Sequence, residues 1–323
     1  GKATIADLPP GTYLATAARW LTASERGRLG GADDALGFVV RVRAEVAAGG
    51  RAVVTMPASR RRSLVMSEWS FNIGDDYHFG GFVELYNNAD TTVYVDGMLL
   101  AEGFNIDYDY PISPCAENAP YTNDGEGVWT RFFQRFPGTG RDYPVLPGQA
   151  VVVATDAIDH RPLSRTGIDL RQANFEFSGF ADADNPAVPN LHEIGLRVQP
   201  EGHGLVFPGN SSVTILARPG DPASFARAHF AQADYVRVPR ALILDVLWRR
   251  SMWDVGLRPC PQLVHARFDR EGSARGTNAN EEAAFSASRH TIAGTLGGGP
   301  VLQHSRSGDT DFTRTRRSPG VVP

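Results

Sequence analysis

The amino-acid sequence predicts an all-β protein, and three observations support this fold class. Apolar and polar residues alternate with a period of two in many short runs, and Gly, Pro, Asn and Asp stand between the runs. Helical periodicity is nearly absent. The 323 residues include 34 Gly and 22 Pro without the repeat of collagen, a content that suits short strands joined by tight turns.

The first sixty residues predict a small group of strands. The turn signal Pro9-Pro10-Gly11 separates two alternating runs, 3–8 and 13–17, and Gly49-Gly50 separates two more, 38–46 and 51–56. Residues 22–29 predict a short helix with Ser24 as the candidate cap. Four strands are fewer than the ~7 of an immunoglobulin-sized sandwich.

The start of the chain resembles a known signature. The pattern Gly1-Lys2-Ala3-x-Ile5-x-x-Leu8-x-Pro10-Gly11-x-Tyr13 is similar to that of carboxypeptidase-regulatory-like, transthyretin-type sandwiches. In that family the signature falls in the middle of the domain. The resemblance therefore implies that the strands expected before Gly1 are absent from this chain.

A domain boundary is expected at Arg60-Arg61-Arg62, because a run of like charges usually marks a solvated junction. The predicted domains are residues 1–61, the partial sandwich, and residues 62–323, a β-sandwich with long loop insertions. One short helix is expected at 222–230. The strands predicted after the opening run 64–68 are 82–87, 92–95, 98–104, 128–136, 149–155, 204–207, 211–216, 235–244 and 261–268.

The second domain resembles the lamin-tail-like superfamily, an immunoglobulin-like β-sandwich. Six blocks occur in the expected order: "SLVMSEW", "FVELYNNADTTVYVDGMLL", "VLPGQAVVVATDAIDH", "LRQANFEF", "DNPAVPNL" and "QHSRSGDTDFTRTRRSPG". They are most similar to a bacterial, secreted branch of unknown function. The chain departs from the usual ending at Ser305-Arg306-Ser307-Gly308, where Asn-Asn tends to precede the final Asp-Phe, so the role of the terminal turn stays open.

The segment 82–97 predicts a hairpin with a structural turn. Alternating runs flank Asn87-Asn88-Ala89-Asp90, and Asn and Asp hydrogen-bond their own turns readily. In lamin-tail-like domains this segment is a core hairpin, which implies structural roles for Glu84, Asn87, Asn88, Asp96 and Gly97.

Composition argues against several partners. The formal net charge is −4 and no basic stripe is interleaved with aromatic residues, so nucleic-acid binding is not expected. Only Lys2 is lysine, which leaves no P-loop or Schiff-base lysine beyond it. No apolar run approaches the ~18 residues of a membrane span.

The two cysteines, Cys115 and Cys260, both lie in proline-flanked settings that are typical of loops. In a secreted protein we expect them to form a structural disulfide that closes 145 residues. The alternative is two unrelated thiols, because spacing alone does not fix a pairing.

Motifs for catalysis are missing from the sequence. No histidine has HExxH or HxH spacing, no Gly-x-Ser-x-Gly occurs, and no glycine loop follows a strand and opens a helix. Short acidic loops remain as candidate Ca²⁺ ligands, against a simpler role as solvated or turn-capping acids. The candidates are Asp107, Asp109, Asp182 and Asp184.

Aromatic residues are dense near the strand 128–136. On a strand, Trp129 and Phe133 share one face, and Phe132 and Phe136 share the other. Burial beneath the 105–127 loop and an intermolecular contact are the two interpretations.

The leading functional hypothesis is an extracellular or cell-surface structural protein that assembles with copies of itself by strand complementation into a filament or surface layer, without a cofactor. The alternative is an adhesin or glycan-binding module whose face includes Tyr108 and Tyr110. An enzyme ranks last because the catalytic motifs are missing.

Overall fold

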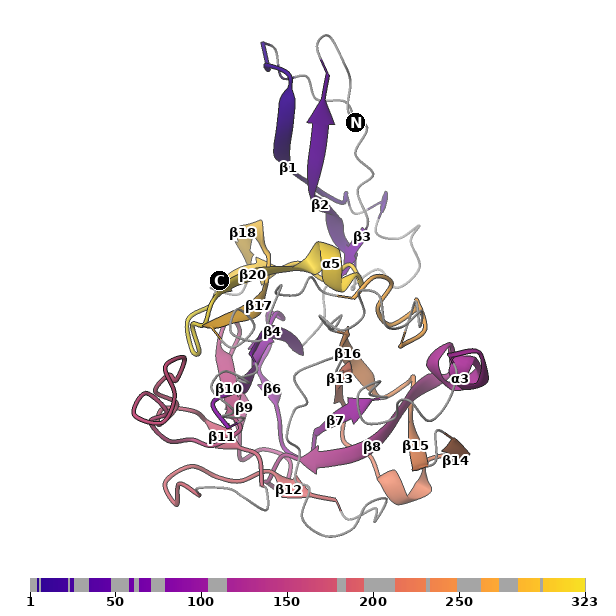
Figure 1. The fold of residues 1–323 in the computed structure, drawn as a ribbon, viewed down its shortest axis with the longest axis vertical. Helices are drawn as coiled ribbons and strands as arrows, with labels where there is room; N and C mark the ends of the chain where they lie inside the picture. Colours follow the sequence, from indigo (N-terminus) through magenta and orange to yellow (C-terminus); the bar gives the residue numbers. More distant parts are fainter. Residues whose placement is uncertain are drawn as a thin grey trace. The chain divides into compact units, whose positions relative to one another are not determined.

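A computed structural model shows that the regular secondary structure of the described residues is almost entirely β-strand (Figure 1). Most strand pairs are antiparallel, and the helices in the described part of the chain are short, among them α3 (Cys115–Thr122) and α5 (Gly308–Asp311). This confirms the all-β prediction. The structure describes residues 5, 7–22, 24–25, 35–47, 58–60, 64–70, 79–103, 115–178, 184–194, 213–230, 233–248, 263–272, 284–296 and 299–322.

The chain divides into two compact units. The smaller unit comprises Gly1–Arg61 with Gln303–Ser305, and the larger unit comprises Arg62–Leu302 with Arg306–Pro323. No helix within the described ranges is long and apolar enough to cross a membrane.

The smaller unit contains a three-stranded antiparallel sheet in the order β1-β2-β3. Strand β1 (Gly11–Trp20) pairs with β2 (Ala35–Val46) in unbroken register from Gly11 opposite Val46 to Trp20 opposite Gly37. Strand β3 (Ala58–Arg60) pairs only with the first residues of β2. The predicted strand 51–56 lies outside the described residues.

The helix expected near residue 22 is capped by Thr22 and not by Ser24. The Glu25 amide donates to Thr22 Oγ1 at 3.3 Å, and the Thr22 amide donates to Glu25 Oε2 at 3.0 Å. These reciprocal bonds form a capping box, in which a Ser or Thr stands three residues before Glu or Gln. Ser24 lies inside this turn, so the sequence prediction placed the cap two residues late.

The larger unit is a sandwich of two sheets. Side chains of both sheets meet in one buried cluster that includes Met66 and Leu85 from the six-stranded sheet and Leu100 and Leu216 from the other. The six-stranded sheet has the order β11 (Phe175–Glu176), β10 (Ala150–Ala154), β5 (Phe82–Asn87), β4 (Leu64–Ser70), β17 (Phe285–Arg289) and β20 (Phe312–Arg316).

The second sheet has the order β14 (Arg227–Phe230), β15 (Ala233–Pro239), β8 (Gly127–Arg135), β7 (Leu99–Gly103), β13 (Val213–Ala217) and β16 (Ile243–Trp248), with β12 (His192–Glu193) paired to β8. Two small ribbons complete the described strands: β6 (Val93–Tyr94) with β9 (Pro144–Val145), and β18 (Thr291–Leu296) with β19 (Gly299–Leu302).

Parts of the outer faces of both sheets are also apolar and covered. On the seven-stranded sheet, residues such as Leu99 and Ile215 pack beneath Phe225 and Phe268. On the six-stranded sheet, Phe82 packs against Leu170. Burial on both faces explains why all seven residues of β4 and all six residues of β5 are buried.

The segment 82–97 is not a hairpin. Strand β5 already has β10 on one edge and β4 on the other, so β6 pairs instead with β9. The following strand β7 belongs to the other sheet. Residues 88–98 therefore carry the chain from one sheet of the sandwich to the other.

Three further predictions were wrong. Residues 222–230 form a three-residue 3₁₀ turn, Pro222–Ser224, followed by β14, because residues 227–230 pair with β15. The run 235–244 is two strands separated by a turn after Pro239, in which the Leu242 amide donates to the Pro239 carbonyl. Residues 263–268 form turns and not a strand, and 204–207 lies outside the described residues.

Candidate functional site

Asn87 closes the segment that follows β5 by binding main chain on both sides. Its Nδ2 donates to the carbonyls of Thr91 and Val145, both at 2.8 Å, and its Oδ1 accepts the Ala89 amide at 2.9 Å. The side chain is fully buried. Each of these three hydrogen bonds joins the Asn87 side chain to a main-chain group.

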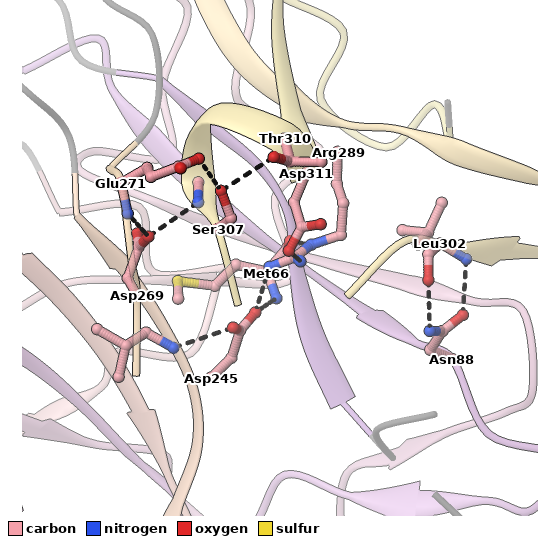
Figure 2. Close-up of polar contacts among 12 residues, drawn as sticks. Met66, Asn88, Asp245, Asp269, Glu271, Arg289, Leu302, Ser307, Thr310 and Asp311 are labelled. Atoms are coloured by element: carbon pink, nitrogen blue, oxygen red, sulfur yellow. Dashed lines mark hydrogen bonds and ion pairs between the residues drawn. The ribbon is translucent and has the colours of Figure 1, made fainter. Parts of the chain in front are cut away.

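The Asn88 side chain bonds to both main-chain groups of Leu302, as a residue of a neighbouring strand would (Figure 2). Its Nδ2 donates to the Leu302 carbonyl at 3.0 Å, and the Leu302 amide donates to its Oδ1 at 2.9 Å. A single amide side chain thereby joins segments 214 residues apart.

Asp96 and Gly97 form the turn before β7. Gly97 has φ +67°, a left-handed conformation that glycine adopts without a steric penalty, and the Met98 amide donates to the Val95 carbonyl at 3.0 Å. The Asp96 carboxylate accepts the amides of Gly140, Asp142 and Tyr143 at 3.0, 2.7 and 2.9 Å. Burial raises the pKa of the Asp96 carboxyl, but these amides outweigh it and hold the pKa below its usual range.

The predicted calcium ligands are not brought together by the described structure. Asp107, Asp109 and Asp182 lie outside the described residues, and Asp184 accepts the Asn190 Nδ2 at 2.8 Å. Within the described ranges, no group of three or more His, Cys, Asp or Glu side chains could hold a metal ion. Cys115 begins α3 and Cys260 lies outside the described residues, so the disulfide stays a prediction.

The aromatic residues of β8 and Phe136, which follows it directly, divide between the two faces as the alternation predicts. Trp129 and Phe133 lie in the outer cluster of the seven-stranded sheet, whereas Phe136 is in the central core with Phe132 packed against it. Tyr121 of α3 packs edge-on to Trp129 with ring centroids 5.4 Å apart. This packing supports burial over an intermolecular contact.

A buried arginine joins four elements near the end of the chain (Figure 2). The Arg289 side chain is 1% exposed; its Nε donates to the Met66 carbonyl at 2.7 Å, and its guanidinium reaches Asp245 at 2.6 Å and Asp311 at 3.3 Å. It also lies 4.3 Å above the ring centroid of Phe312. One cation between two carboxylates is a structural clamp, because every charged partner is buried with it.

Asp269 holds the turn before α5. Its carboxylate accepts four main-chain amides, among them those of Trp248 at 3.1 Å and Gly308 at 2.9 Å. Burial raises the pKa of Asp269 although these amides oppose the shift. Ser307 donates to Glu271 at 2.7 Å, which places the unusual Ser305–Gly308 block within this network (Figure 2).

The least expected group is a pair of carboxylates on the outer face of the six-stranded sheet. Glu68 of β4 and Glu84 of β5 are opposite each other in register, and both are fully buried. A β-bulge between Met66 and Glu68 turns Ser67 toward the same face, where its hydroxyl donates to Glu84 Oε1 at 2.6 Å. Residues opposite each other on antiparallel strands have Cβ atoms only ~4.5–5.5 Å apart.

The residues after β20 cover this carboxylate pair. The amide and hydroxyl of Ser318 donate to Glu68 at 2.9 and 2.8 Å, and the Gly320 amide donates to Glu84 Oε2 at 2.7 Å. Burial, helped by the neighbouring Glu68 charge, raises the pKa of Glu84 to about 7, and burial also raises the pKa of Glu68.

Sequence reasoning interpreted Glu84 as structural and did not single out Glu68. The available signal was a glutamate in each of two strands, "LVMSEWS" and "FVELYN", that are otherwise largely apolar. What the sequence could not provide is the register that places the two side chains together.

Comparison with known proteins supports the fold alone. The chain is similar to the crystal structure of a DUF4876 family protein from Bacteroides thetaiotaomicron, with a TM-score of 0.62 and 16% sequence identity over 99% of this chain and 85% of the other. No family model matches the sequence, and no curated protein matches it.

Proposed function

We propose that the protein is an extracellular structural protein that assembles with copies of itself by adding a β-strand at the edge of β1. The observation that carries this proposal is the character of that edge. Among the described strands, β1 pairs only with β2, over ten residues and without a bulge.

The β1 edge has few of the features by which proteins block strand addition. Such features are short edge strands, bulges, prolines and charged side chains, especially lysine. Strand β1 is long, contains no proline, and has one charged residue, Arg19, next to its last position. Its described side chains Tyr13, Ala15 and Ala17 are half-buried. An extended partner would bind such an edge through main-chain hydrogen bonds.

The polar groups of the larger unit also favour a scaffold over a catalyst. The described carboxylates Asp96, Asp269, Glu68 and Glu84 are buried and accept main-chain amides. A general acid or nucleophile needs access to substrate, which this burial denies. The burial of these described carboxylates therefore supports the proposed structural role.

The lamin-tail-like assignment of residues 62–323, the transthyretin-type assignment of residues 1–61 and the secreted location belong to the same proposal. They rest on the sequence blocks, and the two-sheet sandwich is compatible with them. The glycan-binding alternative depends on Tyr108 and Tyr110, which lie outside the described residues.

The proposal is tested by blocking the β1 edge. Ala15→Lys places a charge in the middle of β1, where it should hinder the approach of another strand. Sedimentation velocity over a concentration series, with electron microscopy of the same samples, should show assembly of the wild type and at least a tenfold higher concentration requirement for the variant.

A matched control uses Leu146→Lys, a charge at an exposed position in a turn of the larger unit. This variant should assemble like the wild type. A wild type that stays monomeric at its highest soluble concentration, or an Ala15→Lys variant that assembles normally, would refute strand addition at β1.

A further inference from the structure

The carboxylate pair and the segment over it form a separable part of the sandwich. Segment 317–320 follows β20 and lies across the outer face of β4 and β5, where Ser318 contacts Glu68 and Gly320 contacts Glu84. The segment is itself half-buried to exposed, although the two carboxylates beneath it are fully buried.

Within the part of the chain that the structure describes, few other contacts hold the segment. Arg317 donates to the Gly80 carbonyl at 3.1 Å, and the Val321 amide closes a turn on the Ser318 carbonyl at 3.0 Å. Val322 packs against the small apolar cluster that includes Val65 and Tyr86. The attachment therefore depends largely on the state of Glu68 and Glu84.

Two carboxylates this close cannot both ionise without a cost, because like charges repel and burial removes the water that would screen them. The charged groups that act on the pair come from the elements around it. Arg317 lies close enough to Glu68 to favour its ionised form, and it also repels a charge on the buried His160. Ser286 of β17 supplies a further hydroxyl to Glu68.

The hydrogen bonds indicate where a proton can reside. The amides of Ser318 and Gly320 can only donate, so Glu68 Oε1 and Glu84 Oε2 must remain acceptors while the segment is docked. The hydroxyls of Ser67 and Ser318 can rotate and accept, which leaves Glu84 Oε1 and Glu68 Oε2 as positions for the proton. The charge of Arg317 favours the ionised form of Glu68, so the proton resides on Glu84 Oε1. Glu68 then carries the single negative charge next to Arg317.

We propose that Glu68, Glu84 and segment 317–320 form a proton-dependent latch, in which the segment stays docked while the pair holds one proton and is released when both carboxylates are ionised. Release lets water reach both carboxylates and uncovers the outer face of β4 and β5. This inference is independent of assembly at β1.

The latch is tested by hydrogen–deuterium exchange of the amides of Ser318 and Gly320, corrected for the intrinsic pH dependence of exchange. If Glu84 changes from a pKa of about 7 when docked to its usual value when open, the opening constant rises about 30-fold between about pH 5.5 and 8.5. Protection of both amides should fall by that factor in the full chain.

Glu84→Gln should remove most of this pH dependence and keep the segment protected at high pH, since the amide resembles a protonated carboxyl. Glu193→Gln, the same change at an exposed strand glutamate, should behave like the wild type. Ser318→Ala should lower protection at both pH values, because one donor to Glu68 is lost.

Equal corrected protection of Ser318 and Gly320 at the two pH values in the wild type would overturn the latch. It would also be overturned if Glu84→Gln kept the full wild-type pH dependence. The wild-type series alone decides the question if Glu84→Gln fails to fold.

Discussion

The pairing between Asn88 and Leu302 makes a sharp prediction for stability. Asn88→Ala removes both hydrogen bonds and leaves the buried amide and carbonyl of Leu302 without their partners. Each lost bond costs about 1 kcal/mol and each unsatisfied buried group adds to this, so we expect the free energy of unfolding to fall by about 2–4 kcal/mol. For a unit of this size the melting temperature should fall by about 5–15 °C.

Asn88→Asp separates hydrogen bonding from side-chain shape. The new carboxylate keeps the acceptor for the Leu302 amide but turns a second oxygen toward the Leu302 carbonyl. Burial and this repulsion raise the folded-state pKa of the introduced acid. Its destabilisation should therefore be largest at neutral pH, should diminish as the pH falls through the raised folded-state pKa, and should be smallest below about pH 4, where the protonated carboxyl can donate to the carbonyl.

The assay is urea unfolding monitored by fluorescence of the buried Trp69 and Trp248, at neutral and acidic pH. Thr92→Ala, an exposed change in the same segment, serves as the control and should stay within about 0.5 kcal/mol of the wild type. The reasoning fails if Asn88→Ala is as stable as the control, or if Asn88→Asp shows no recovery at low pH.

Three further substitutions test other buried groups. Asp96→Ala leaves three amides without an acceptor and should cost about 2–4 kcal/mol in urea unfolding. Because the folded-state pKa of Asp96 is lowered, the wild type should lose this contribution as the pH falls through that pKa, and the variant should lack the effect. Arg289→Met leaves Asp245 and Asp311 buried without their cation and should cost about 3–5 kcal/mol, measured by thermal unfolding against the wild type. The folded-state pKa of Glu84 is raised, so its contribution to stability is complete below pH 4.5 and is lost as the pH rises towards about 7. The free energy of unfolding of Glu84→Gln should therefore exceed that of the wild type by up to about 3 kcal/mol at pH 8. Equal melting temperatures of the two proteins at that pH would contradict this.

The strands were predictable where burial on both faces leaves a continuous apolar run. The runs 82–87 and 149–155 correspond to β5 and β10 with boundaries shifted by one residue at most, because a largely apolar run and its flanking turn residues are local signals. The prediction of one strand at 235–244 was wrong because two strands with the same alternation are separated by a short turn. In the sequence, only Pro239 indicates that turn.

Strand pairing was not predictable from the same signals. We predicted that 82–87 pairs with 92–95 because the two runs are neighbours in the chain. In the structure, β5 pairs with β4 on one edge and with β10 on the other. The turn residues were recognised by type, but their partners were not. Asn87 binds Val145 and Asp96 binds Tyr143, and no local pattern gives such distant contacts.

Several polar contacts of the described residues span long sequence separations and end in residues 300–320. Residues 300–320 are bound by Asn88, Glu68 and Glu84 across separations of 214, 250 and 236 residues. Closing such long loops costs entropy before any contact is gained, so the bonds of segment 317–320 should form after the local pairing of β4 with β5, the strands that carry Glu68 and Glu84. A segment that docks last on a finished sheet can also open without unfolding the sheet, since local openings need only break the contacts of the segment itself. Control of segment 317–320 by one proton is therefore compatible with a stable sandwich beneath it.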